Sequence, residues 1–217
     1  KMADAHWFIE LMERGGKIVT ITPEYSPPAT KADYWIPTRP GLGDTAIFLG
    51  ITRILMERNL YDAAFVKGLT DFPLLVRADT LKRLDPKDVI AGYRPGLPAD
   101  GPSFKIQGLT SEQYARLQDY VVIDSRTNQP VAVTREDVGT KLAAKGIDPV
   151  LDYRGEVTLT SGQRVEVMTL WEAYKVHLQD YDLDSVAEIS GAPKDLIERL
   201  AMDIATIKPV AIHVGEG

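Results

Sequence analysis

The chain has 217 residues, of which 44% are hydrophobic and 26% are charged, a composition typical of a globular protein large enough to bury a core. Its net charge of -6 and pI near 5.2 argue against a nucleic acid or an anionic membrane surface as a partner, because both require clustered lysine and arginine. The lack of cysteine excludes disulfides, thiolate metal ligands and iron–sulfur ligation within these residues, and no apolar run is long enough for direct membrane insertion.

The first part of the chain alternates helical and strand patterns. Apolar residues on one face predict a helix that the Gly15–Gly16 pair ends, and a β-branched run at 17–22 predicts a short, buried parallel strand. Repeated prolines exclude a regular helix over the next stretch, which we expect to be an ordered loop with a short extended piece at 34–37. Asp44 is a natural N-cap for a helix over 44–58.

The middle of the chain has a different character, because proline, glycine and aspartate become frequent from residue 85 onward. Two alternating patterns, at 120–133 and 156–167, predict β-hairpins that turn at 127–129 and 161–162. We therefore expect an insertion of hairpins within an α/β domain.

Helical patterns return towards the end of the chain. They predict helices at 169–181, at 182–191 with Gly191 just after the last turn, and at 193–207. An apolar run at 210–214 predicts a further buried strand.

These patterns predict an α/β fold with a doubly wound, Rossmann-like parallel sheet and an inserted block of β-hairpins and short helices. We divide the chain into three parts. Residues 1–84 form an α/β dinucleotide-cofactor-binding unit, 85–168 form an irregular and hairpin insertion, and 169–217 return to the α/β unit with helices and a parallel strand.

The loop after the first strand is one candidate binding site. Glu24 lies just past that strand, where an acidic side chain of a doubly wound fold can accept hydrogen bonds from ribose hydroxyls. Thr22, Tyr25 and Ser26 add hydroxyls and backbone amides at the same carboxyl end. The alternative is that Glu24 is a solvated loop carboxylate.

The sequence "RPGLGD" is a second candidate. Gly41 and Gly43 allow the backbone to approach a ligand closely, and Asp44 adds a carboxylate at a helix N-terminus. A carboxylate can accept two parallel hydrogen bonds from the N1–H and the exocyclic amine of guanine. The alternative is that Asp44 is only an N-cap and that the glycines only form a turn.

The chain offers no catalytic or metal-ligating residues of its own that we can assign. His6, His177 and His213 have no second histidine at the spacing of a recognised metal motif. No nucleophile elbow and no phosphate loop of the Gly-x-x-x-x-Gly-Lys type is present in the sequence.

Several stretches nevertheless resemble a known family. "TPEYSPPATKADYWIPTRPGLGD" and "SVAEISGAPKDLIERLAMDIATIKPVAIHVGEG" are similar to the catalytic alpha subunits of molybdopterin oxidoreductases of the dimethyl sulfoxide reductase superfamily. "TDFPLLVRADTLKRL", together with "HLQDYDLDSVAEISGAPKDLIERLA", looks most like nitrite oxidoreductase and the respiratory nitrate reductase-like enzymes. The resemblance covers nearly the whole chain.

The resemblance implies that both candidate loops hold the guanosine diphosphate end of molybdopterin guanine dinucleotide. The residues that it places in the site are Thr22, Pro23, Glu24, Tyr25, Ser26, Gly41, Leu42, Gly43 and Asp44. The usual family form is Pro-Gly-Thr-Asp or Pro-Gly-Ser-Asp. This chain has one additional residue between Gly41 and Asp44, so the family pattern does not assign roles to Leu42 and Gly43.

The resemblance also implies an enzyme. Its cofactors would be molybdenum with bis-molybdopterin guanine dinucleotide and a 4Fe-4S cluster, whose ligands, like the catalytic residues, lie outside these residues. The implied reaction is interconversion of nitrite and nitrate by transfer of two electrons and an oxygen atom. The implied partners are a small inorganic substrate and an iron–sulfur electron-transfer subunit, with a haem subunit as a further candidate. We expect a periplasmic or membrane-associated complex rather than a cytoplasmic one.

A second function remains open at this point. The same loops could belong to a stand-alone nucleotide-binding or regulatory α/β domain without a metal. The chain starts inside a helical pattern and stops after a strand and glycines, and we therefore expect it to be an excerpt of a longer polypeptide. The residues alone do not select among nitrite, nitrate, chlorate, selenate and hydrocarbon substrates.

Overall fold

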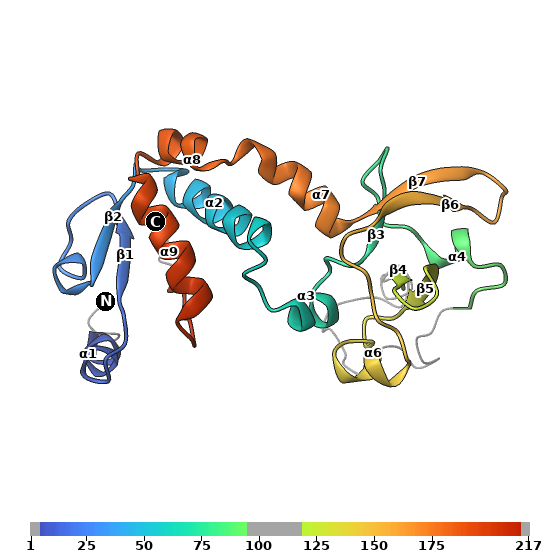
Figure 1. The fold of residues 1–217 in the computed structure, drawn as a ribbon, viewed down its shortest axis with the longest axis horizontal. Helices are drawn as coiled ribbons and strands as arrows, with labels where there is room; N and C mark the ends of the chain where they lie inside the picture. The colour runs from blue at the N-terminus through green and yellow to red at the C-terminus, as the bar shows by residue number, and fades with distance from the viewer. Residues whose placement is uncertain (1–4, 95–118, 214–217) are drawn as a thin grey trace, which may run out of the picture. The chain divides into compact units, whose positions relative to one another are not determined.

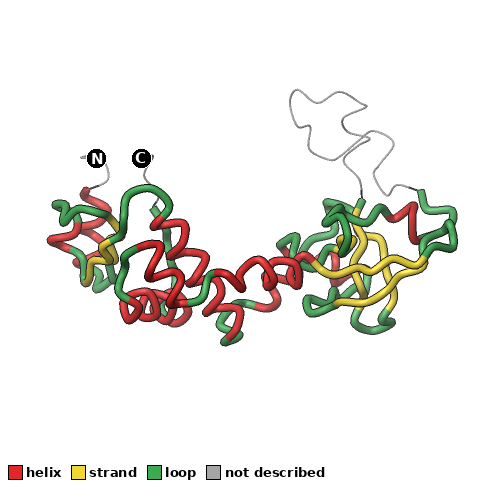
Figure 2. Tube along the Cα trace, turned by 90° about the horizontal axis from the view of Figure 1, so that it is seen from above, coloured by secondary structure: helices red, strands yellow, loops and turns green. Residues whose placement is uncertain are grey.

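The computed structural model describes residues 5–94 and 119–213 (Figure 1). Helices and strands are mixed along the chain, as the predicted α/β class requires (Figure 2). The described residues form two compact units, the first from residues 5–61 and 178–213 and the second from residues 62–94 and 119–177. No helix in the described part of the chain combines the length and apolarity needed to cross a bilayer.

The first unit is built from a short parallel sheet and a group of helices. Its elements are α1 (Ala5–Glu13), β1 (Val19–Thr22), η2 (Ala29–Lys31), β2 (Tyr34–Pro37), α2 (Gly43–Glu57), η3 (Leu178–Asp180), α8 (Leu183–Ser190) and α9 (Lys194–Thr206). Strands β1 and β2 pair in parallel, from Val19 opposite Tyr34 to Thr22 opposite Pro37. The predicted parallel pairing is thus present, in a sheet of two strands.

Apolar side chains from both ends of the sequence form the core of the first unit. Ile36 of β2, Ile47 of α2 and Ile197 of α9 are each 0% exposed. Helix α2 approaches α8 closely at Gly50, where an added Cβ would lie 2.8 Å from a methyl carbon of Val186. This contact explains why a glycine stands inside a helix, where it is normally unfavourable.

A polar cluster also joins the sheet to α9. The carboxylate of Asp203 accepts hydrogen bonds from the ammonium group of Lys17 at 2.9 Å and from the hydroxyl of Tyr34 at 2.8 Å. Burial raises the pKa of Asp203, but these two donors outweigh burial and hold the pKa below its ordinary value. The same cluster raises the pKa of Tyr34, chiefly through burial and through the bond to Asp203.

The second unit is mainly antiparallel. Its elements are α3 (Ala63–Leu69), β3 (Leu75–Arg77), α4 (Pro86–Val89), β4 (Tyr120–Asp124), β5 (Gln129–Val133), α6 (Thr140–Ala144), β6 (Arg154–Thr158), β7 (Arg164–Thr169) and α7 (Leu170–His177). Strands β4 and β5 form one hairpin, and β6 and β7 form another, to which β3 adds as a third strand. Both hairpins were predicted, and Asn128 and Gly162 provide positive φ angles at their turns.

The compact units divide the chain at 61/62 and 177/178, whereas the sequence suggested divisions at 84/85 and 168/169. Strand β3 lies before residue 85, yet it pairs with β7. The described strands β4 to β7 pair in antiparallel sheets and not with the parallel pair β1–β2. Residues 95–118 of the predicted insertion lie outside the described residues. The assignment of residues 1–84 and 169–217 to cofactor binding stays a prediction.

The strand predicted at 210–214 is not observed over its described part. Residues 210–213 have no strand geometry, and Val210 and Ile212 are 42% and 59% exposed. A strand forms only where a neighbouring strand pairs with it, and no described strand pairs with this run. Residue 214 lies outside the described residues.

Candidate cofactor-binding loops

The two loops selected from the sequence leave the same edge of the β1–β2 sheet. The strands are parallel, and Thr22 at the end of β1 stands opposite Pro37 at the end of β2. The loop of residues 23–26 and the loop of residues 38–42 therefore start side by side. The carboxyl edge of a parallel sheet is where doubly wound folds bind ligands. The sequence identified each loop separately, and the strand pairing brings them together.

The first loop is held at its base and open beyond it. The indole N–H of Trp35 donates to the carbonyl oxygen of Thr22 at 2.9 Å, and the rings of Trp35 and Tyr25 pack edge to face with centroids 5.3 Å apart. The N–H of Ser26 donates to the carbonyl oxygen of Glu24 at 2.8 Å, which closes a tight turn. Pro23 and Glu24 are exposed, and Glu24 makes no side-chain hydrogen bond or ion pair with the described residues. Its carboxylate is thus accessible to a ligand.

The two glycines of the second loop have different surroundings. Gly41 has a φ of +101°, and the space around the position of an added Cβ is open. At Gly43 an added Cβ would lie 2.2 Å from the hydroxyl oxygen of Thr38 and 3.5 Å from the backbone of Ser190. Gly43 therefore serves close packing within the protein, while Gly41 and the 76%-exposed Leu42 face outward.

Asp44 is not the N-cap of α2, which corrects the capping role expected from the sequence. The cap residue is Leu42, and no side chain supplies a capping hydrogen bond. Asp44 lies in the first helical turn, is exposed, and accepts a hydrogen bond from the N–H of Thr45 at 2.8 Å through one carboxylate oxygen. The N-cap is thus two residues earlier than the sequence suggested, and the first helical residue, Gly43, packs against Ser190. A negative charge in the first turn is favourable to the helix dipole.

The end of α8 anchors the second loop, an arrangement that the sequence did not reveal. The N–H of Arg39 donates to the carbonyl oxygen of Ser190 at 2.6 Å, and the Arg39 guanidinium donates to the carbonyl oxygen of Glu188. Ser190 is completely buried, and its hydroxyl donates to the carbonyl oxygen of Val186 at 2.6 Å. Gly191 then turns the chain with a φ of +71°. The sequence predicted that a helix ends at Ser190–Gly191. It did not indicate that this helix end contacts Arg39.

The residues present fit a nucleotide-like group at this edge. They offer two exposed carboxylates, of Glu24 and Asp44, and a backbone at Gly41 that no side chain shields. They do not fit a metal ion by themselves. Among the described residues, no group of three or more histidine, aspartate or glutamate side chains could hold one.

Comparison with known proteins gives a consistent set of relatives, although no family model matches the chain. The chain is 31% identical to the perchlorate reductase subunit alpha of Dechloromonas aromatica (strain RCB), over 100% of this chain and 23% of that protein. It is 32% identical to the respiratory nitrate reductase subunit alpha of Haloferax mediterranei, over 100% of this chain and 21% of that protein. It is 36% identical to the thiosulfate reductase molybdopterin-containing subunit of Salmonella typhimurium, over 46% of this chain and 13% of that protein.

The predicted resemblance to molybdopterin oxidoreductase catalytic subunits is confirmed. The chain spans between a fifth and a quarter of the length of the first two of these relatives. Acetylene hydratase from Pelobacter acetylenicus is a solved structure that matches 93% of this chain and 14% of its own, at 18% identity and a TM-score of 0.43.

Proposed function

We propose that this chain is part of the catalytic subunit of a molybdenum oxidoreductase, in which it holds the guanosine end of molybdopterin guanine dinucleotide. The observation that carries the proposal is the pairing of Thr22 with Pro37, which places both candidate loops at one carboxyl edge. The name of one relative, a thiosulfate reductase molybdopterin-containing subunit, supports the molybdopterin part of the proposal.

Each loop residue has a role that its surroundings support. The exposed carboxylate of Asp44 accepts two hydrogen bonds from the N1–H and amine of guanine, and Glu24 accepts from ribose hydroxyls. Gly41 lets the backbone approach the diphosphate, whose charge is favourable at the N-terminus of α2. Thr22, Pro23, Tyr25, Ser26 and Leu42 shape the same edge, and Gly43 fixes the loop against Ser190.

The chemistry belongs to the cofactor. When bound, the bis-molybdopterin guanine dinucleotide supplies a molybdenum centre for transfer of two electrons and an oxygen atom. The residues of this chain bind and orient the nucleotide end. A 4Fe-4S cluster and the catalytic side chains are expected elsewhere in the subunit.

The substrate that we propose is a small oxyanion, with nitrite/nitrate interconversion as the specific reaction. The names of two relatives, a perchlorate reductase and a respiratory nitrate reductase, support the oxyanion class. An iron–sulfur electron-transfer subunit is the proposed partner, with a haem subunit as a further candidate. The proposed location is a periplasmic or membrane-associated complex.

Replacement of Asp44 by asparagine in the full-length enzyme tests the guanine site. Asparagine turns one acceptor oxygen into an NH₂ donor that faces the donor edge of guanine, at a cost of about 2–4 kcal/mol. We expect less molybdenum and less guanine nucleotide per protein, measured after denaturation. Asp195→Asn is the matched control, because Asp195 is an exposed acid in the first turn of α9. Cofactor content that is unchanged in the Asp44 variant would refute the guanine role.

A further inference from the structure

The second unit contains a cavity of about 400 Å³, separate from the loops proposed to hold the cofactor. It is lined by the β4–β5 hairpin, by the segment that follows β5, and by residues that follow α3. Apolar side chains of Val122, Val133 and Leu142 contribute to its lining. The volume suffices for a small polyatomic ion with its first waters.

Two arginines of the lining share one aromatic ring. The guanidinium carbon of Arg83 lies 4.9 Å from the ring centroid of Tyr120, and that of Arg135 lies 5.7 Å from the same centroid. Neither guanidinium forms an ion pair or a hydrogen bond with any described residue. The Nε of Arg135 is also buried without a hydrogen-bond partner. Arg83 is exposed and Arg135 is half-buried, so water reaches both side chains, but a buried donor such as this Nε is normally paired. Neither arginine has a carboxylate counter-charge among the described residues.

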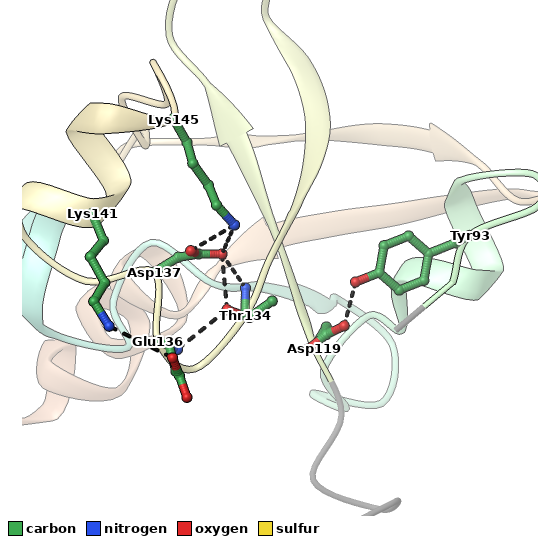
Figure 3. Close-up of polar contacts among 7 residues, drawn as sticks. All are labelled: Tyr93, Asp119, Thr134, Glu136, Asp137, Lys141 and Lys145. Atoms are coloured by element: carbon green, nitrogen blue, oxygen red, sulfur yellow. Dashed lines mark hydrogen bonds and ion pairs between the residues drawn. The ribbon is translucent and has the colours of Figure 1, made fainter. Parts of the chain in front are cut away.

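The acidic residues of the lining do not provide that counter-charge. The carboxylate of Asp137 is occupied by the ammonium group of Lys145, 2.7 Å from either oxygen, and by the N–H and hydroxyl of Thr134 at 2.8 Å and 3.0 Å (Figure 3). Asp71 is exposed and has no ion pair with the described residues. Lys67 is balanced by Asp148 at 3.4 Å. The lining therefore contains two arginines and one acid, Asp71, that have no ion pair with the described residues.

The same hydrogen bonds fix the backbone that presents Arg135. Thr134 and Asp137 are bonded to each other through side chain and backbone, and the N–H of Glu136 donates to the hydroxyl of Thr134 at 3.3 Å (Figure 3). Arg135 thus extends from a rigid turn. A site whose backbone is already ordered loses less entropy when a ligand binds.

We propose that this cavity binds a small oxyanion, such as sulfate, phosphate or a carboxylate, between Arg83 and Arg135. The planar guanidinium groups match the oxygens of such an ion and form charge-assisted hydrogen bonds with it. The ion supplies the missing counter-charge to both arginines. This site does not depend on the cofactor role proposed above.

Arginine labelling of the full-length protein tests the site locally. The protein reacts with phenylglyoxal in sodium sulfate or in sodium chloride at equal ionic strength. Mass spectrometry then measures the rate at which each arginine is modified in each salt. At a sulfate concentration ten times its Kd, modification of Arg83 and Arg135 slows about tenfold. Arg164 is the control, because it is exposed in the same unit and has no ion pair with the described residues. Its rate does not change between the two salts. Acetate in place of sulfate tells whether a carboxylate or a tetrahedral ion protects better.

Sulfate binding provides a second measurement. Equilibrium dialysis with radiolabelled sulfate compares the wild-type protein with Arg83→Gln/Arg135→Gln and with Arg164→Gln. The double variant loses one sulfate per chain, whereas Arg164→Gln retains it. The proposal is overturned by unchanged stoichiometry in the double variant, by equal protection of Arg164, or by an Arg83 that does not react in either salt, since the cavity would then be closed to ions.

Discussion

The backbone N–H of Arg39 lies 2.6 Å from the carbonyl oxygen of Ser190, so a hydrogen bond joins the loop before α2 to the end of α8. Beside it, Gly191 has a φ of +71°, and an added Cβ would lie 3.1 Å from the Arg39 side chain. The loop proposed to hold guanine is thus positioned by a helix end that is distant in sequence.

Gly191→Ala should lower the free energy of unfolding by more than backbone strain alone would. A left-handed alanine costs about 1 kcal/mol, and the crowded Arg39 adds to that cost. Gly162→Ala is the control, because Gly162 has a φ of +85° with open space around the Cβ position. Urea unfolding measures both variants. Equal losses of stability in the two variants would mean that the contact with Arg39 does not add to the cost.

Gly50→Ala and Gly68→Ala should have opposite effects on stability. At Gly50 an added Cβ would lie 2.8 Å from Val186, so the helices must separate, at a cost of about 1–3 kcal/mol. At Gly68, in α3, the nearest atom is an ordinary 3.5 Å away, and alanine gains up to about 1 kcal/mol of helix propensity. Thermal unfolding measures the difference. A neutral Gly50→Ala would show that the packing of α2 on α8 tolerates a methyl group.

Tyr34→Phe should destabilise the first unit by about 1 kcal/mol, because it removes the hydroxyl that donates to Asp203 at 2.8 Å. Tyr25→Phe is the control, since Tyr25 is 62% exposed and its hydroxyl has no partner among the described residues. A double variant with Asp203→Asn measures the coupling between the two groups in urea unfolding. If the stability losses of the two single variants add up in the double variant, the Tyr34–Asp203 hydrogen bond does not contribute to stability.

The acid stability of the second unit should depend on Lys145. Burial raises the pKa of Asp137, but the bond to Lys145 and those to Thr134 outweigh burial and hold the pKa below its ordinary value. A carboxyl whose pKa is lowered on folding stabilises above its unfolded pKa, and this contribution is lost as pH falls through the folded pKa. Lys145→Met should raise the pKa of Asp137, so stability falls at a higher pH.

Urea midpoints measured across the acid range test this shift. Lys141→Met is the control, because its ion pair with Glu136 is longer, at 3.7 Å, and Lys141 is exposed. If the urea midpoint falls over the same pH range in both variants, the role assigned to Lys145 is wrong.

Local signals were sufficient for much of the fold. The hairpin turns and the end of α8 follow from residues that adopt positive φ, such as Asn128, Gly162 and Gly191. These signals act within a few residues and need no knowledge of distant partners. The mixed α/β class followed from the order of such elements.

Features set by distant contacts were not predictable. Leu42 takes the capping position of α2, with Gly43 packed against Ser190, so Asp44 was misread as a cap. The run at 210–213 has the composition of a strand but lacks a described neighbour to pair with. For the candidate site, the sequence identified the loops on either side of β2, whereas their common origin required the pairing of Thr22 with Pro37.

The two-stranded sheet has a practical consequence for the handling of this segment. β1 and β2 pair only with each other among the described strands, so each has one edge that no described strand covers. Uncovered edges offer backbone donors and acceptors to strands of other molecules. Residues 1–217 produced as a separate polypeptide would therefore self-associate as the concentration rises, and light scattering would detect aggregates seeded at this sheet.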